Sequence, residues 1–200
     1  LERLHERYPD LLIEGCSGGG GRFDAGMLYY TPQIWCSDNT DAVERIKIQY
    51  GTSFAYPSCT VGSHVSAVPN HQTGRIQNLR HGQQLPWRAV LVMNLDLNLL
   101  TEEEKEQVRE QIKNYHRFEM LIRQGRYYRL TDVWQKKEYA AWEYCRPDGS
   151  EALVTVVTLD TQCNPATEYV KLRGLGEDKK YRVEVVGMQT GGENGQRING

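Results

Sequence analysis

The chain has 200 residues, 39% of them hydrophobic, which is enough to bury a core in one or two domains. Its formal net charge of −2 argues against a nucleic-acid partner, because nucleic-acid-binding domains usually carry a basic face. No apolar run approaches the roughly 18 residues that would span a bilayer, so the sequence does not indicate a membrane protein.

The five cysteines indicate neither a disulfide framework nor a zinc site. They are odd in number, widely spaced and never form a C-x-x-C pair. We therefore expect no bound metal and a reducing, cytoplasmic location. The residues concerned are Cys16, Cys36, Cys59, Cys145 and Cys163.

The first part of the chain reads as strands and helices in alternation. Residues 11–16, 33–37 and 59–66 have the apolar character of short strands, and residues 41–50 have one apolar helical face. This rhythm predicts parallel β/α units. Asp41 and Glu44 have capping-box spacing at the start of that helix, whereas Asp38 or Thr40 could serve as its cap instead.

The later part begins with a long helix and continues with strands. Thr101 and Glu104 form a capping box, and Gly125 ends the apolar periodicity. Turn signals then separate strand-like segments, which predicts an antiparallel β domain. The expected strands are residues 138–144, 151–157 and 181–186, and a mobile loop is expected at residues 191–200.

A run of four glycines, residues 18–21, follows the first predicted strand. Glycines leave the backbone bare, so that a ligand can approach main-chain N–H groups. No Gly-Lys-Ser/Thr closes the run, and phosphate binding is therefore not expected. The run is either a flexible surface loop or one wall of a binding site, and its place after an apolar strand favours the binding site.

Four motifs occur in order: Cys16-Ser-Gly-Gly-Gly-Gly-Arg-Phe-Asp24, Trp35-Cys-Ser-Asp-Asn-Thr-Asp-Ala42, Arg45-Ile-Lys-Ile-Gln-Tyr-Gly51 and His64-Val-Ser-Ala-Val-Pro-Asn-His-Gln72. Together they closely resemble the α-galactosidases of glycoside hydrolase family 36. The resemblance implies an α/β fold followed by an all-β fold. Residues 1–125 would form the C-terminal part of a (β/α)8 TIM barrel, and residues 126–200 an incomplete antiparallel β-sandwich domain.

The resemblance implies hydrolysis of terminal α-linked galactose from melibiose- and raffinose-type sugars, with retention and without metal or cofactor. A retaining glycosidase uses two carboxyl groups. The family's nucleophilic aspartate lies in a Lys-Trp-Asp motif that is absent here, so it is expected upstream. Asp38 matches the acid/base, although its local sequence alone favours a helix cap. Asp41 is the alternative acid.

The same resemblance assigns the sugar contacts. Cys16 matches a sugar-contacting cysteine, and its alternative is an inert buried thiol. Gly18 and Gly19 would let the sugar approach the backbone. Trp35 could offer an apolar face to the sugar or belong to the core. The remaining polar candidates are His64 and His71, expected to be supporting or core residues, and Asn70 and Gln72, which could bond outer sugars.

Two other functions remain open from the sequence. A transglycosylase of the raffinose-synthase kind would share the barrel chemistry and hand the galactosyl group to a sugar instead of water. A carbohydrate-binding or scaffolding module without catalytic activity is the non-enzymatic alternative. For the leading interpretation, the partner is a small α-galactoside, and the intact enzyme is expected to be a homo-oligomer.

Overall fold

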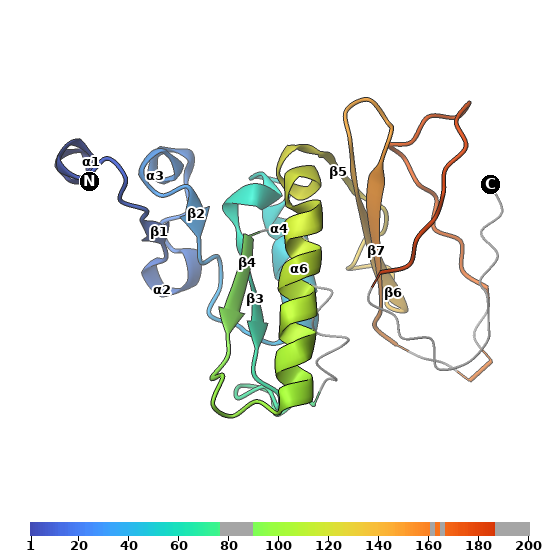
Figure 1. Ribbon diagram of the computed structural model, residues 1–200, viewed down its shortest axis with the longest axis horizontal. Coiled ribbons are helices and arrows are strands. Elements are labelled where there is room, and N and C mark those ends of the chain that lie inside the picture. Colours follow the sequence, from blue (N-terminus) through green and yellow to red (C-terminus); the bar gives the residue numbers. More distant parts are fainter. Residues whose placement is uncertain (77–89, 161–162, 165–166, 187–200) are drawn as a thin grey trace.

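The computed structural model describes residues 1–76, 90–160, 163–164 and 167–186. Short helices and parallel strands occupy one end of the molecule, and an antiparallel sheet occupies the other (Figure 1). The elements of the first part are α1 (Glu2–Arg7), β1 (Glu14–Gly15), α2 (Ser17–Gly20), α3 (Ala25–Tyr30), β2 (Gln33–Ile34), α4 (Ala42–Thr52), η1 (Ser58–Thr60), β3 (Gly62–Ser66) and β4 (Val90–Asn94). They are followed by α6 (Glu102–Gln124), β5 (Arg126–Arg129), β6 (Tyr139–Cys145) and β7 (Ala152–Thr158).

The strands of the first part are parallel and follow one another in chain order. β1 pairs with β2, a single bridge joins Ile34 to Val61, and β3 pairs with β4 from Gly62↔Val90 to Ser66↔Asn94. The predicted parallel β/α units are therefore confirmed. Because the strands are parallel, their carboxyl ends lie at the same edge of the sheet. In (β/α)8 barrels, the fold expected for this part, the functional groups gather at this edge.

The two main helices begin as their sequences predict. Asp41 is the N-cap of α4, and Thr101 with Glu104 forms a complete capping box on α6. At α4 the box is incomplete, because the Asp41 amide donates instead to Oδ1 of Asn39, over 3.0 Å. Asp41, and neither Asp38 nor Thr40, is thus the cap.

The second part contains an antiparallel sheet in the order β5-β6-β7. Its last two strands confirm the predictions at residues 138–144 and 151–157. The strand predicted at residues 181–186 is wrong, because this segment makes side-chain contacts in place of a strand ladder. Tyr181 donates to the carbonyl of Gly149 over 2.6 Å, and Glu184 pairs with Arg117 of α6. The loop expected at residues 191–200 lies outside the described residues.

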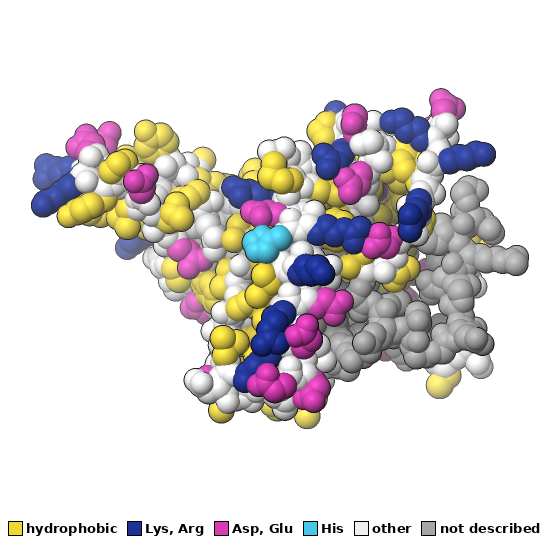
Figure 2. Space-filling view, in the orientation of Figure 1, with side chains coloured by type: hydrophobic (Ala, Val, Ile, Leu, Met, Phe, Trp, Pro, Cys, Tyr) yellow, Lys and Arg dark blue, Asp and Glu magenta, His cyan; other side chains and the backbone are white. Residues whose placement is uncertain are grey.

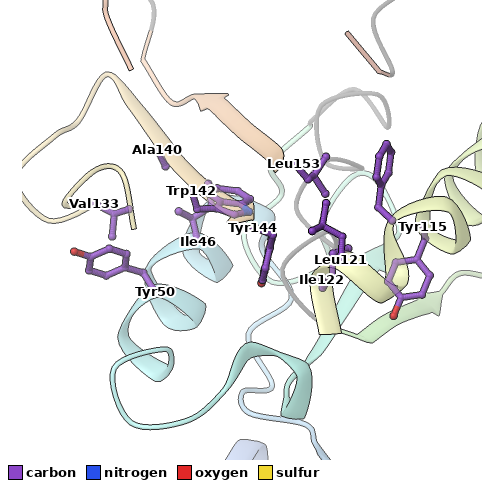
Figure 3. Close-up of a cluster of buried hydrophobic side chains, with 11 residues drawn as sticks. Ile46, Tyr50, Tyr115, Leu121, Ile122, Val133, Ala140, Trp142, Tyr144 and Leu153 are labelled. Atoms are coloured by element: carbon purple, nitrogen blue, oxygen red, sulfur yellow. The ribbon is translucent and has the colours of Figure 1, made fainter. Parts of the chain in front are cut away.

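The main hydrophobic core lies where α4 and α6 meet the antiparallel sheet (Figure 3). Trp142 and Tyr144 of β6 are fully buried against apolar residues of α4 and α6. The complete cluster is Ile46, Tyr50, Tyr115, Phe118, Leu121, Ile122, Val133, Ala140, Trp142, Tyr144 and Leu153. The parallel and antiparallel parts are therefore held together by shared apolar burial, the dominant favourable contribution to folding.

The N-terminal end is much less buried. The strand predicted at residues 11–16 is reduced to β1, and Leu12 is 85% exposed. Figure 2 shows hydrophobic side chains gathered over this end of the molecule. Within the described residues β1 pairs only with β2, so its other edge is open. None of the described helices combines the length and apolar character needed to cross a membrane.

Candidate active site

Three loops that follow β1, β2 and β3 converge on Asp38. The loop after β2 carries Asp38 itself. The glycine loop after β1 approaches the Asp38 backbone so closely that a Cβ on Gly19 would lie 2.7 Å from the Asp38 nitrogen. From the loop after β3, Nε2 of Gln72 donates a 3.0 Å hydrogen bond to the Asp38 carbonyl. The carboxyl edge of the parallel sheet thus gathers around one aspartate.

The Asp38 side chain is exposed and is oriented by Trp35. The Trp35 indole donates from Nε1 to Oδ1 of Asp38 over 3.0 Å. The same indole stacks on His64 of β3, with ring centroids 3.9 Å apart and planes inclined by 9°. Trp35 is half-buried, so it combines both roles that its sequence left open: one face packs inward, and the N–H reaches the candidate acid.

His64 provides a neutral, buried surface beneath Trp35. Burial, assisted by the positive charge of Arg45, lowers the pKa of His64 to about 3. The ring is only 8% exposed, and within the described residues neither ring nitrogen has a hydrogen-bond partner. His64 therefore packs against Trp35 as an uncharged ring near neutral pH.

The glycine loop is built from left-handed backbone. Gly18, Gly19 and Gly20 have φ values of 65°, 74° and 101°, a region that glycine enters without the steric cost of a Cβ. A Cβ on Gly20 would lie 2.8 Å from the Cys36 carbonyl oxygen. Gly19 and Gly20 are thus needed for close contact with the loop after β2, which the sequence analysis did not anticipate. A Cβ on Gly18 would meet nothing within 4 Å among the described residues.

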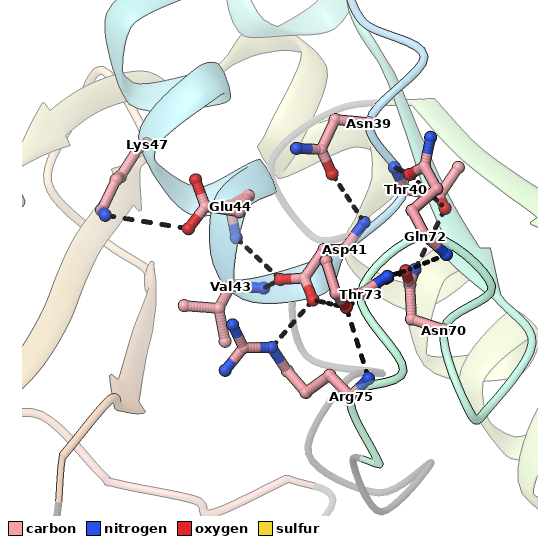
Figure 4. A network of polar contacts seen from close by, with 10 residues as sticks. All are labelled: Asn39, Thr40, Asp41, Val43, Glu44, Lys47, Asn70, Gln72, Thr73 and Arg75. Atoms are coloured by element: carbon pink, nitrogen blue, oxygen red, sulfur yellow. Dashed lines mark hydrogen bonds and ion pairs between the residues drawn. The ribbon is translucent and has the colours of Figure 1, made fainter.

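Asp41 is fully buried, and its carboxylate is occupied by the protein (Figure 4). Oδ1 accepts from the amides of Val43 and Glu44, and Oδ2 accepts from Oγ1 of Thr73 over 2.7 Å and from Nε of Arg75 over 2.8 Å. Burial acts to raise the pKa of Asp41, but the hydrogen bonds from Thr73, Arg75 and Glu44 outweigh it and hold the pKa below its usual value.

A buried arginine, which was not among the predicted site residues, joins the loop after β2 to the first residue of β3. The Arg45 guanidinium, from α4, donates to the carbonyls of Ser37 over 2.9 Å and Gly62 over 2.8 Å. Burial lowers the pKa of Arg45 and raises the pKa of the Cys36 thiol near it. The sequence carries no clear signal for this role, because successive helix positions lie roughly 100° apart and Arg45 therefore falls outside the apolar face of Val43, Ile46 and Tyr50.

The other predicted site residues are placed as follows. Cys16 is exposed at the start of the glycine loop and is a free thiol. Asn70 and Gln72, which were candidates for bonding outer sugars, both bond to the protein. Asn70 donates to Oγ1 of Thr40, and Gln72 donates to the carbonyl of Asp38. His71 is exposed. In the part of the chain that the structure describes, no group of three or more His, Cys, Asp or Glu side chains could hold a metal ion.

A family model described as Melibiase matches residues 1–125, which is more than half of the chain. The chain belongs to the melibiase family. A second model, described as the glycosyl hydrolase family 36 C-terminal domain, matches residues 139–197. These matches confirm the resemblance that the ordered motifs indicated.

Curated members of the melibiase family align along almost the whole chain. The bifunctional α-galactosidase/sucrose kinase AgaSK of Mediterraneibacter gnavus is 55% identical over 96% of this chain and 20% of its own length. The α-galactosidase AgaA of Geobacillus stearothermophilus is 44% identical over 96% of this chain and 26% of its own length. The chain therefore spans only a fifth to a quarter of these relatives.

Solved structures of the melibiase family share the fold. The galactosidase domain of AgaSK superposes with a TM-score of 0.84 at 57% identity, and a variant of AgaA in complex with raffinose superposes with a TM-score of 0.84 at 44% identity. Each match covers 88% of this chain and 24% of the solved one. The expected fold class, part of a (β/α)8 barrel followed by an antiparallel β domain, is confirmed; the division at residues 125 and 126 stays a prediction.

Proposed function

We propose that this chain supplies the acid/base part of the active site of a retaining α-galactosidase. The observation that carries the proposal is the exposed Asp38 carboxylate, oriented by Trp35 at the carboxyl edge of the parallel sheet. Catalytic groups of such barrels come from this edge. The α-galactosidase names of the relatives support the same activity. The substrates are small α-galactosides of the melibiose and raffinose type.

The mechanism assigns Asp38 two successive proton transfers. In the first step the protonated Asp38 gives its proton to the glycosidic oxygen, while an aspartate of the upstream segment attacks the anomeric carbon and forms a glycosyl ester. The bond between that carbon and the glycosidic oxygen breaks, and the rest of the sugar leaves as an alcohol. In the second step the Asp38 carboxylate removes a proton from water as the water oxygen attacks the same carbon. The ester bond breaks, the upstream carboxylate is released, and Asp38 is protonated again.

The surroundings of the two aspartates favour Asp38 over Asp41. A general acid must come within hydrogen-bond reach of the oxygen it protonates. Asp38 is exposed, whereas Asp41 is 0% exposed and both its oxygens accept hydrogen bonds from the protein. Asp41 therefore serves as the cap of α4 and not as the acid.

Residues of the neighbouring loops form the galactose site in this proposal. Gly18, which faces open space, and Cys16, which is exposed, line the sugar, and Trp35 contributes the part of its ring that His64 leaves uncovered. Gly19 contributes its backbone to the sugar site, because the position that a Cβ would occupy is directed at the Asp38 backbone. A cytoplasmic location and a homo-oligomeric assembly are part of the same proposal.

The test uses the intact protein with its upstream segment. Asp38→Ala should slow raffinose hydrolysis about 100-fold or more, because general acid catalysis contributes roughly 10²–10⁴-fold. Turnover of an activated aryl galactoside should fall much less, because its leaving group needs little protonation. Azide should partly restore the turnover of the variant. If Asp41→Ala gave this selective pattern instead, the acid would be Asp41. Product analysis with raffinose as donor and acceptor then separates hydrolysis from the transfer expected of a raffinose-synthase-like enzyme.

A further inference from the structure

Gln72 is an exposed residue whose amide nevertheless bonds to the protein at both ends. Nε2 donates to the carbonyl of Asp38 over 3.0 Å, and Oε1 accepts from the amide of Thr40 over 2.8 Å. Oε1 also lies 3.2 Å from Oγ1 of Thr40. One side chain thus spans the backbone immediately before and after Asn39 and fixes the segment that carries Asp38.

The chemistry of the partners determines how the amide is oriented. The Asp38 carbonyl can only accept a hydrogen bond and the Thr40 amide can only donate one, so Nε2 must face Asp38 and Oε1 must face Thr40. The pairing copies the donor and acceptor pattern of a neighbouring strand. Asparagine is the only other side chain with a planar amide, in which the donor and the acceptor are bonded to the same carbon.

The loop that presents Gln72 is itself held by hydrogen bonds (Figure 4). Oδ1 of Asn70 accepts from the amides of Gln72 and Thr73, each over 3.0 Å. The Asn70 side chain is buried and also donates to Thr40, and Thr73 donates to Asp41. Gln72 therefore reaches the Asp38 segment from a fixed support.

The same segment is also in close contact with the backbone of the glycine loop. A Cβ on Gly19 would lie 2.7 Å from the Asp38 nitrogen and 3.1 Å from the Ser37 Cα, so the glycine loop packs directly against it. Arg45 donates a hydrogen bond to the Ser37 carbonyl. Gln72 is exposed, whereas Gly19 is partly buried and Arg45 is 3% exposed, so Gln72 can be replaced without disturbing a buried contact of Gly19 or Arg45.

We propose that Gln72 is a positioning residue for Asp38: its amide fixes the Asp38–Thr40 backbone so that the Asp38 carboxyl stays in place during proton transfer. This inference rests on the acid/base role proposed for Asp38. Gln72 itself touches no reacting atom. Its loss lets the segment move away from the glycine loop, and a small displacement of a catalytic group lowers the rate of the step in which that group acts.

The expected signature is a dependence on the leaving group. Protonation matters most when the leaving group is poor, so a displaced acid slows sugar leaving groups more than activated phenols. Gln72→Met keeps the length of the side chain and removes both hydrogen bonds. In the intact protein it should lower kcat for raffinose about tenfold or more and kcat for a dinitrophenyl galactoside less than about threefold, as expected when part of general acid catalysis is lost. Inhibition by galactose should be nearly unchanged.

Gln72→Glu provides a rescue by protonation. A carboxylate accepts from Thr40 as before but places an oxygen against the Asp38 carbonyl, whereas a protonated carboxyl can donate to it. Its raffinose activity relative to wild type should rise as the pH is lowered toward the pKa of a glutamic acid, about 4.3. Gln72→Met should show no such recovery.

Thr73→Val is the matched control. It removes the hydrogen bonds of the Thr73 hydroxyl, which reach Asp41, Asn70 and the amide of Arg75, and keeps the side chain of Gln72 that bonds to the Asp38 carbonyl. It should lower the melting temperature without a leaving-group dependence. Asp38→Ala is measured in parallel. If it shows the selective loss and azide rescue while the Gln72 variants affect both substrates equally or not at all, the positioning role is overturned and the acid/base role stands. If Asp38→Ala lacks that pattern, both are overturned.

Discussion

The indole N–H of Trp35 donates a 3.0 Å hydrogen bond to Oδ1 of Asp38, three residues later in the chain. The two residues are close in sequence, but the position of Trp35 depends on a distant residue, because its indole stacks on His64 of β3. It links the orientation of the candidate acid to the packing between two strands.

Trp35→Phe should therefore impair catalysis with little loss of folding. Phenylalanine retains an aromatic ring over His64 but has no N–H for Asp38. Because Asp38 would lose the donor that orients it, kcat for raffinose should fall about tenfold or more, as expected when part of general acid catalysis is lost. Steady-state kinetics and a thermal melt of the intact protein measure the two effects. A melting temperature that falls while kcat stays constant would contradict this role.

The two neighbouring glycines give a matched pair of variants. Gly18→Ala and Gly19→Ala both place a Cβ at positive φ, which costs roughly 1–2 kcal/mol. Only the Cβ of Gly19→Ala would press on the Asp38 backbone, so this variant should lose more kcat than Gly18→Ala. Gly18→Ala should act mainly through KM, since its Cβ enters the open space assigned to the sugar. Equal losses of kcat would argue against the contact with Asp38.

Asp41→Asn should destabilise the protein by about 2–3 kcal/mol, because the charged acceptor of Thr73 and Arg75 is lost. The pKa of Asp41 is lowered in the folded state, so its ionisation stabilises the protein above the unfolded pKa of about 3.9. This contribution disappears as the pH falls through the folded pKa. The melting temperature of the variant should thus depend less on pH in acid. The wild-type protein, melted over the same pH range, is the control.

Glu143→Gln should loosen the segment that follows the antiparallel sheet. The Glu143 carboxylate is fully buried in β6 and accepts from the amides of Arg173 over 2.8 Å and Gly174 over 3.0 Å. An amide side chain offers one acceptor and would direct its NH₂ at the second donor, a loss of about 1–3 kcal/mol. Limited proteolysis should cut residues 167–186 faster than in wild type. Glu151→Gln, which alters only an exposed pair with Arg146, should leave the cleavage rate unchanged.

Local sequence signals identified most of the regular elements. The Thr101–Glu104 capping box and the apolar periodicity up to Gly125 placed α6, and turn signals placed β6 and β7. The segment at residues 181–186 failed because alternating valines resemble a strand, whereas Val183 and Val185 are 55% and 64% exposed and no partner strand is present within the described residues. Strand pairing depends on a neighbour that the local sequence does not reveal.

The site residues are predicted from the sequence and stay predictions, whereas the contacts that support them appear only in the structure. The position of Asp38 after a strand was readable from the motif. The inward bonds of Gln72 and the close packing of Gly19 join residues separated by 34 and 19 positions from Asp38, so they arise only when the loops are brought together. From the sequence alone, a polar side chain such as Gln72 can equally well be expected to bind the sugar or to hydrogen-bond the protein. Arg45 was missed because an arginine in an amphipathic helix is usually on its wet face.

The core shared by α4, α6 and the antiparallel sheet limits where two related sequences can be recombined. Ile46 and Tyr50, from the helix that follows Asp38, pack in the same cluster as Trp142 of β6, and Tyr144 donates to Ser58 across 86 positions of sequence. A chimaera with its crossover just after Gly125 would join a helical face from one parent to a sheet shaped for another. A functional chimaera should therefore take α4, α6 and the sheet from a single parent. The segment that must be exchanged as one piece is thus larger than the antiparallel sheet alone.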